Sequence, residues 1–189
     1  MGDEAYGLTN LVLDLRAIAA ATRDAGSTVA QVRPLALRMA ANPTWVRPEH
    51  YQCDPEIGIG VHLLSEEPDH TLAVLAVAWL PHRGVEPHNH GTTWAVVAGV
   101  DGPERNRFWK RLDDASRDGY AELRQESEKI VGKGDVVSIM PDGIHSVAND
   151  TDAVTLSLHV YGMNINHIRR FQFDVENRIV RRHPRSLAT

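Results

Sequence analysis

The chain has 189 residues, of which 42% are hydrophobic and 24% charged, as in one ordinary globular domain rather than a disordered chain. Its net charge of −5 argues against nucleic acid or an anionic membrane as a partner. No apolar stretch approaches the roughly 20 residues that cross a bilayer. The single cysteine, Cys53, excludes an internal disulfide, and the N-terminus lacks a basic segment followed by an apolar run, so we expect a cytoplasmic protein.

Two amphipathic helices are expected at the start of the chain. Apolar residues recur at helical spacing over residues 8–21, and a second helix is expected over residues 27–41, with Ser27 as its N-cap. We expect these helices, within residues 1–42, to pack on the remainder of a single domain that spans residues 1–189.

Beyond Thr44 the pattern changes to short apolar or alternating runs separated by turn residues. Many short strands with frequent turns predict an all-β sandwich or barrel, here over residues 44–180. The charged stretch 113–129 contains either a further strand or exposed turns, and residues 81–87 are expected to form a turn. The predicted strands are 57–64, 71–80, 92–100, 105–111, 136–140, 153–161 and 171–175.

A His-x-His pair follows the turn expected at 81–87. On an extended strand, residues two apart project from the same face, so His88 and His90 can direct both imidazoles to one point. Neutral imidazole is the commonest metal ligand and suits iron, zinc, copper or nickel. Such a pair is also compatible with two exposed loop histidines that bind nothing.

A second segment, Gly134 to Asn149, carries His145 shortly after a Pro/Gly turn. Together with the His-x-His segment it resembles the two motifs of the cupin superfamily. This resemblance implies a double-stranded β-helix barrel whose metal is held by His88, His90 and His145. Cupins usually place a glutamate ligand about four or five residues after the second histidine, but Trp94 and Ala95 stand there in this chain. Three neutral ligands would leave a dication its full charge, which favours an anionic ligand such as a thiolate.

A third pattern lies on the strand expected at 153–161. Because side chains alternate along a strand, Ser157, His159 and Tyr161 share one face. This pattern resembles the Ser-His-Tyr motif of the thiol dioxygenases, the family of cysteine dioxygenase and 3-mercaptopropionate dioxygenase. The resemblance implies an Fe(II) cofactor and a catalytic role for the three residues. A purely structural hydrogen-bond network is the alternative.

The resemblance also indicates how a substrate is held. The bacterial mercaptopropionate branch takes its carboxylate-binding arginine from just beyond the Ser-His-Tyr strand, and Arg170, nine residues after Tyr161, matches that position best. Arg169 would point to the opposite face, and both could instead be surface charges. The glutamine that this branch carries on an early strand falls at Val61 or His62, so His62 either contacts a polar substrate group or simply packs.

Animal cysteine dioxygenases carry a cysteine that cross-links to the tyrosine, but the matching position here is near Ala95, so we expect Tyr161 to be unmodified. Cys53 is too far upstream to replace it and is expected to be a buried free thiol.

The expected function is therefore an Fe(II) thiol dioxygenase that oxidises a small mercapto-carboxylic acid to a sulfinate with O2. The candidate substrates are 3-mercaptopropionate or a similar acid, mercaptosuccinate and cysteine, and the chain is expected to be a monomer or small homo-oligomer. The alternatives are another metal-dependent cupin enzyme, such as an isomerase or a carbon-oxidising dioxygenase, and a non-catalytic cupin that binds a small acid.

Overall fold

The computed structural model describes residues 6–182; residues 1–5 and 183–189 of the expected domain lie outside the described part. The chain begins with helices α1 (Leu8–Ala21) and α2 (Ala25–Ala41) and the short turns η1 (Pro43–Trp45) and η2 (Pro48–Tyr51). The first predicted helix is confirmed, but the N-cap prediction for the second is wrong. Asp24 caps α2 by accepting a hydrogen bond from the Ser27 backbone N–H at 2.8 Å, so Ser27 lies inside the first turn. No helix among residues 6–182 is long and apolar enough to cross a membrane.

The rest of the described chain forms antiparallel strands in two sheets. The five-stranded sheet has the order β1-β2-β9-β4-β7 and the six-stranded sheet the order β11-β10-β3-β8-β5-β6. The strands are β1 (Ile59–Ser65), β2 (Thr71–Trp79), β3 (Gly84–Asn89), β4 (Ala95–Asp101), β5 (Glu104–Arg111), β6 (Leu123–Val131), β7 (Val136–Ile139), β8 (Ile144–Ala148), β9 (Thr155–Met163), β10 (Phe171–Asp174) and β11 (Ile179–Arg182), with the short turn η3 (Ile165–His167) before β10.

The pairing of these strands identifies the fold. β5 pairs with β6, β4 with β7, β3 with β8 and β2 with β9, so the segment from β2 to β9 is one long antiparallel hairpin rolled into a barrel. This nested pairing is the double-stranded β-helix, the jelly roll of the cupins. The predicted fold class, a β-barrel preceded by helices, is confirmed.

The pairing of the strands corrects one prediction from the sequence and decides another. Residues 81–87 are not wholly a turn, because β3 already begins at Gly84; its pairing with β8 is shifted between Val85 and His88, where a bulge accommodates Pro87, which has no N–H to donate. In the charged stretch 113–129, the strand is β6, which continues to Val131. β6 lies at the edge of its sheet, so its side chains are mostly exposed and carry no apolar pattern.

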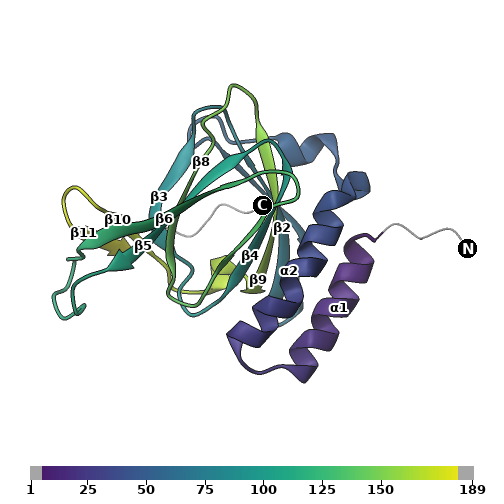
Figure 1. Ribbon diagram of the computed structural model, residues 1–189, viewed down its shortest axis with the longest axis horizontal. Helices are drawn as coiled ribbons and strands as arrows, with labels where there is room; N and C mark the ends of the chain where they lie inside the picture. The colour runs from purple at the N-terminus through teal and green to yellow at the C-terminus, as the bar shows by residue number, and fades with distance from the viewer. Residues whose placement is uncertain (1–5, 183–189) are drawn as a thin grey trace, which may run out of the picture.

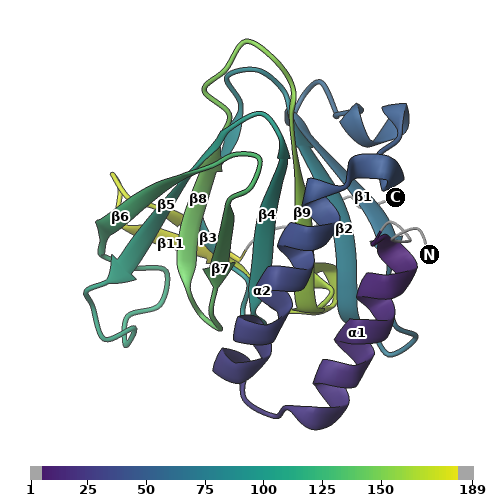
Figure 2. The same ribbon diagram turned by 45° about the vertical axis from the view of Figure 1, so that its right-hand side comes forward.

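The helices cover the outer face of the five-stranded sheet. Figures 1 and 2 show α1 and α2 side by side, with α2 lying against that sheet, where it contacts β4, β7 and β9. The core on this face joins Leu11 and Met39 of the helices to Val74, Val96 and Leu158 of β2, β4 and β9. Because β2 and β4 are buried on both faces, their sequences are continuously apolar rather than alternating.

β9 is different, because its two faces differ in polarity. Leu156, Leu158 and Val160 belong to the core beneath the helices, and the alternate residues face the barrel interior. The helices therefore fix which face of β9 is inside, and they turn Ser157, His159 and Tyr161 inward.

Candidate metal centre

The three histidines of the two motifs meet inside the barrel. β3 and β8 are neighbours in the six-stranded sheet, and His88 and His145 lie directly opposite each other in their register. His90 follows β3 immediately, and all three side chains are buried. The hairpin pairing thus brings together residues more than fifty positions apart in sequence.

The geometry of the three rings suits a metal ion. One ring nitrogen from each histidine lies within 4.8 Å of those of the other two, and Nε2 of His90 is 3.2 Å from Nε2 of His145. With metal–nitrogen bonds of about 2.0–2.1 Å, two nitrogens on one ion at octahedral or tetrahedral angles are about 2.8–3.4 Å apart. This pair already has the separation that a shared ion requires.

The protonation states also favour a metal. Nδ1 of His88 lies 2.9 Å from the backbone carbonyl oxygen of Glu86. A carbonyl only accepts, so Nδ1 carries the proton and the lone pair is on Nε2. Burial lowers the pKa of His90 well below its usual value and that of His145 to about 3, with smaller contributions from neighbouring histidines. The imidazoles of His90 and His145 are therefore neutral, which is the form that binds metals.

No carboxylate among the described residues joins this group. Of the two residues where cupins usually carry the glutamate, Trp94 packs in the core beneath the helices, and Ala95 lies opposite Tyr161 in the register of β4 and β9. The side chain of Glu86 is exposed on the outside of the barrel. The donor set consists of three neutral nitrogens, so an ion bound there keeps its full positive charge.

A chain of hydrogen bonds runs along β9 to the histidines. Oγ of Ser157 is 3.0 Å from Nε2 of His159, and Nδ1 of His159 is 2.9 Å from the hydroxyl oxygen of Tyr161. The Tyr161 ring meets that of His90 edge-on, with centroids 5.1 Å apart. Burial lowers the pKa of His159 to about 3 and raises that of Tyr161, so both are neutral. Three polar groups inside an apolar barrel are compatible with folding because they satisfy one another.

The segment around the His-x-His pair, Asn89 to Gly91, holds Arg170 beside the histidines. Oδ1 of Asn89 accepts a hydrogen bond from the Phe171 N–H at 2.8 Å, which ties the start of β10 to the His-x-His segment. At Gly91 (φ +58°), a Cβ would approach the carbonyl oxygen of Arg169 to 2.3 Å, so only glycine lets these two backbones lie this close. Asn89 and Gly91 therefore fix where residue 170 enters the barrel.

Arg170 is a buried cation with one guanidinium nitrogen, Nη2, left without a hydrogen-bond partner among the described residues. Burial lowers the pKa of its guanidinium, and its charge acts on both His90 and Tyr161. Arg169, by contrast, is exposed and lies over the Phe171 ring at 5.7 Å. A buried, unpaired guanidinium is unfavourable by itself and is expected at a site that binds an anion.

The structure does not bring His62 to this group. Ile59 and Val61 of β1 pack against the barrel interior, so His62 points to the other face, where Nε2 lies 2.9 Å from the carbonyl oxygen of Gln52. Cys53 is a free thiol, but it is half-buried rather than fully buried, and burial raises its pKa.

A second cluster, Glu66, His70 and His167, lies at the surface near η3. The rings of His70 and His167 are stacked 3.5 Å apart at 7°. Because a metal lies close to the plane of each imidazole that binds it, parallel stacked rings do not share an ion in this arrangement.

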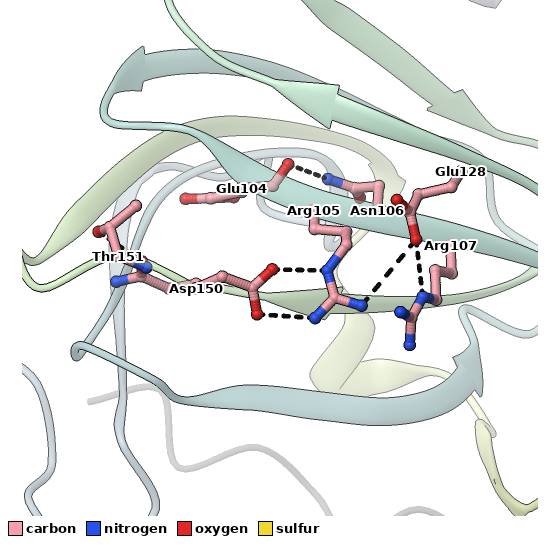
Figure 3. A network of polar contacts seen from close by, with 8 residues as sticks. Glu104, Arg105, Asn106, Arg107, Glu128, Asp150 and Thr151 are labelled. Carbon is pink, nitrogen blue, oxygen red and sulfur yellow. Dashed lines mark hydrogen bonds and ion pairs between the residues drawn. The ribbon is translucent and has the colours of Figure 1, made fainter.

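A groove of about 870 Å³ lies on the outer face of the six-stranded sheet. Figure 3 shows two of its arginines paired, Arg105 with Asp150 and Arg107 with Glu128. Unlike Arg170, these guanidinium groups have carboxylate partners within the protein.

Glu104, which is buried inside the barrel, was not predicted from the sequence as an interior residue. The predicted strand began one residue later, at Arg105. Alternation with Asn106 and Phe108 is the signal that would have placed Glu104 on the inner face.

No family model matches this sequence. Among solved structures, KdgF from Halomonas sp. is 15% identical with a TM-score of 0.48, the match covering 63% of this chain and 91% of that one. TT1209 from Thermus thermophilus is 18% identical with a TM-score of 0.46, covering 59% of this chain and 89% of that one. An oxalate oxidase in complex with the substrate analogue glycolate is 15% identical with a TM-score of 0.47, covering 63% of this chain and 59% of that one. The order and pairing of its own strands give this chain the cupin fold, with a buried group of three histidines that could hold a metal ion.

Proposed function

We propose that this protein is an Fe(II)-dependent thiol dioxygenase that converts a small mercapto-carboxylic acid into a sulfinate. The observation that carries the proposal is the hydrogen-bond chain from Ser157 through His159 to Tyr161, which ends against His90 of the three-histidine group. A cupin that only binds a small acid has no use for such a chain. The carboxylate-free donor set supports the same function, because it favours an anionic sulfur ligand.

The three nitrogens suit Fe(II), which when bound would supply the redox chemistry by which both atoms of O2 are transferred to sulfur, R–SH + O2 → R–SO2H. The thiol provides all the electrons, so the balance needs no other reductant. Sulfur and O2 would meet within the reach of Tyr161 and Arg170, two polar side chains that lie near His90.

Two residues of the chain would orient and protonate the reacting groups. The guanidinium of Arg170 would bind the substrate carboxylate with two parallel hydrogen bonds, which fixes the direction of the thiol. The hydroxyl of Tyr161, kept neutral by burial, would hold a proton beside the sulfur, with its ring position set by His159. A carboxylate on the thiol is therefore the substrate feature that the site recognises.

The experiment is a stoichiometry measurement on purified protein loaded anaerobically with Fe(II). With 3-mercaptopropionate, mercaptosuccinate and cysteine as substrates, O2 uptake and sulfinate formation, followed by an oxygen electrode and mass spectrometry, should agree at one to one for at least one thiol. Zn(II)-loaded protein is the control, because it occupies the same nitrogens without redox chemistry. Iron-loaded protein that consumes no O2 with any thiol acid would refute the proposal.

A further inference from the structure

Glu104 is a buried carboxyl group that the proposed reaction does not yet use. It opens β5, and its side chain is 1% exposed. Figure 3 shows Glu104 and Asn106 on one side of this strand and Arg105 and Arg107 on the other. Because the two arginines line the outer groove, Glu104 points into the barrel.

The carboxyl group of Glu104 lies beside Ser157, which begins the hydrogen-bond chain on β9. Thr155 packs against Gly102, two residues before Glu104, and the hydroxyls of Thr155 and Ser157 act on the carboxyl, although neither carboxyl oxygen has a hydrogen bond of standard geometry with any described residue. Buried polar groups are nearly always hydrogen-bonded, so a carboxyl group in this position calls for a role. Ser157 is the only one of the two hydroxyls that also contacts His159 among the described hydrogen bonds.

Burial controls the charge of Glu104. It raises the pKa of the carboxyl to about 7, while the Ser157 and Thr155 hydroxyls act in the opposite direction. His159, which is linked to Ser157 by a hydrogen bond, is kept neutral by burial. The charged side chains on the elements packed around Glu104 are exposed or paired with acids: Asp101 on β4, Arg105 on β5 and Lys129 on β6. No cation among the described residues acts on Glu104 to hold it ionised, so its carboxyl exchanges its proton near neutral pH.

We propose that Glu104 is a fourth member of the Ser157–His159–Tyr161 chain and that its protonation sets the direction in which the chain donates. This inference rests on the proposed function. Glu104 is a positioning residue, because it acts on the reacting groups only through Ser157 and His159.

The two directions follow from the donors present. A protonated Glu104 donates to Oγ of Ser157, whose hydroxyl donates to Nε2 of His159; Nδ1–H of His159 then donates to Tyr161, and the tyrosine hydroxyl is left to donate toward the metal centre. An ionised Glu104 only accepts, so Ser157 donates to it and each bond reverses. The proton of Tyr161 is then directed to Nδ1 of His159 instead of the substrate.

The first test reads the carboxyl directly and needs no activity. Infrared spectra of the metal-free protein should show the C=O band of a protonated carboxyl group that disappears with a midpoint near pH 7. The band should be absent in Glu104→Gln and retained in Glu128→Gln, which alters an acid on the outer face. In Ser157→Ala, which leaves Glu104 in place, the midpoint should rise, because a hydroxyl that lowers this pKa is removed. An unchanged midpoint in Ser157→Ala, or a midpoint near the ordinary value of 4.5 in the wild type, would overturn the proposal.

The second test measures turnover of the Fe(II)-loaded protein. Wild-type kcat should fall about tenfold per pH unit above the midpoint, because only the protonated fraction of Glu104 orients the chain correctly. Glu104→Gln, whose amide always donates and never titrates, should keep its kcat through this range with an unchanged KM. A Glu104→Gln profile that matches the wild type would refute the proposal. If no thiol gives sulfinate, the proposed function is refuted instead. The infrared midpoint of Glu104 and its shift in Ser157→Ala need no turnover, so they test the link between the two residues separately.

Discussion

Replacing Arg170 with methionine removes a buried cation while keeping most of the apolar length of the side chain. No other Arg or Lys is buried in residues 6–182. Truncating one partner of a buried, hydrogen-bonded charge pair costs about 3–4 kcal/mol. Solvent screening does not reduce this figure, because the side chain is 5% exposed. At about 1.4 kcal/mol per tenfold, the dissociation constant of a thiol acid should rise roughly 100- to 1000-fold.

The same substitution should not destabilise the free protein. Without a substrate, the guanidinium is desolvated and Nη2 has no partner among the described residues. Removing such a charge relieves a penalty, so the free energy of unfolding in urea should stay constant or increase. Weaker binding with unchanged or higher stability separates a substrate contact from a structural residue.

The assay is anaerobic calorimetry of the Fe(II)-loaded protein with 3-mercaptopropionate and with propane-1-thiol, which lacks the carboxylate. Arg170→Met should weaken binding of the acid only, so the two ligands should bind with similar affinity in the variant. Arg169→Met is the matched control, because Arg169 is exposed and its side chain makes a cation–π contact with Phe171. Equal losses for both ligands, or no loss for the acid, would refute the assignment of Arg170 as the carboxylate clamp.

Three further predictions concern the tyrosine, the core and the pH dependence of stability. Tyr161→Phe should lower kcat at least tenfold with unchanged iron content, whereas Tyr51→Phe, which loses a bond to Asp101 on the protein surface, should leave kcat unchanged; equal rates in both variants would contradict a role for the hydroxyl. Leu158→Ala should lower the free energy of unfolding by about 2–5 kcal/mol, because this fully buried side chain joins the sheet to the helices; Leu13→Ala, at an exposed position, should change it by less than about 0.5 kcal/mol in the same urea titration. His159 stays neutral in the folded protein down to about pH 3 but takes up a proton near pH 6.5 when unfolded, so its contribution to stability is lost as the pH falls from about 6.5 to about 3. In the metal-free protein, His159→Gln should therefore reduce the slope of unfolding free energy against pH by about 1.4 kcal/mol per pH unit over this range. An unchanged slope would contradict the burial of a neutral His159.

The sequence was sufficient wherever spacing within one element decides the structure. Residues 8–21 repeat apolar side chains at helical period, and the helix lies where this period places it. His88 and His90, and likewise Ser157, His159 and Tyr161, are two residues apart, and the structure brings each set together. Arg169 and Arg170, which directly precede β10, lie in different environments, one exposed and the other buried, as the sequence predicted.

The sequence was insufficient where the answer depends on a partner strand. β3 begins at Gly84 because Gly84 pairs with Ala148 of β8, and nothing in residues 81–87 by themselves indicates this pairing. His62 and Val61 have similar local patterns, and only the packing of β1 turns Val61 inward and leaves His62 beside Gln52.

The amino-acid pattern alone thus determined which side chains share a face, because the period of a helix or strand is a property of the local backbone. Which of the two faces is inside, and which distant residues meet there, was decided by the tertiary structure. The opposition of His88 and His145 and the burial of Glu104 beside Ser157 depend on the register between strands and on the helices covering one sheet. These arrangements minimise exposed apolar surface over the whole chain, and no single segment contains that information.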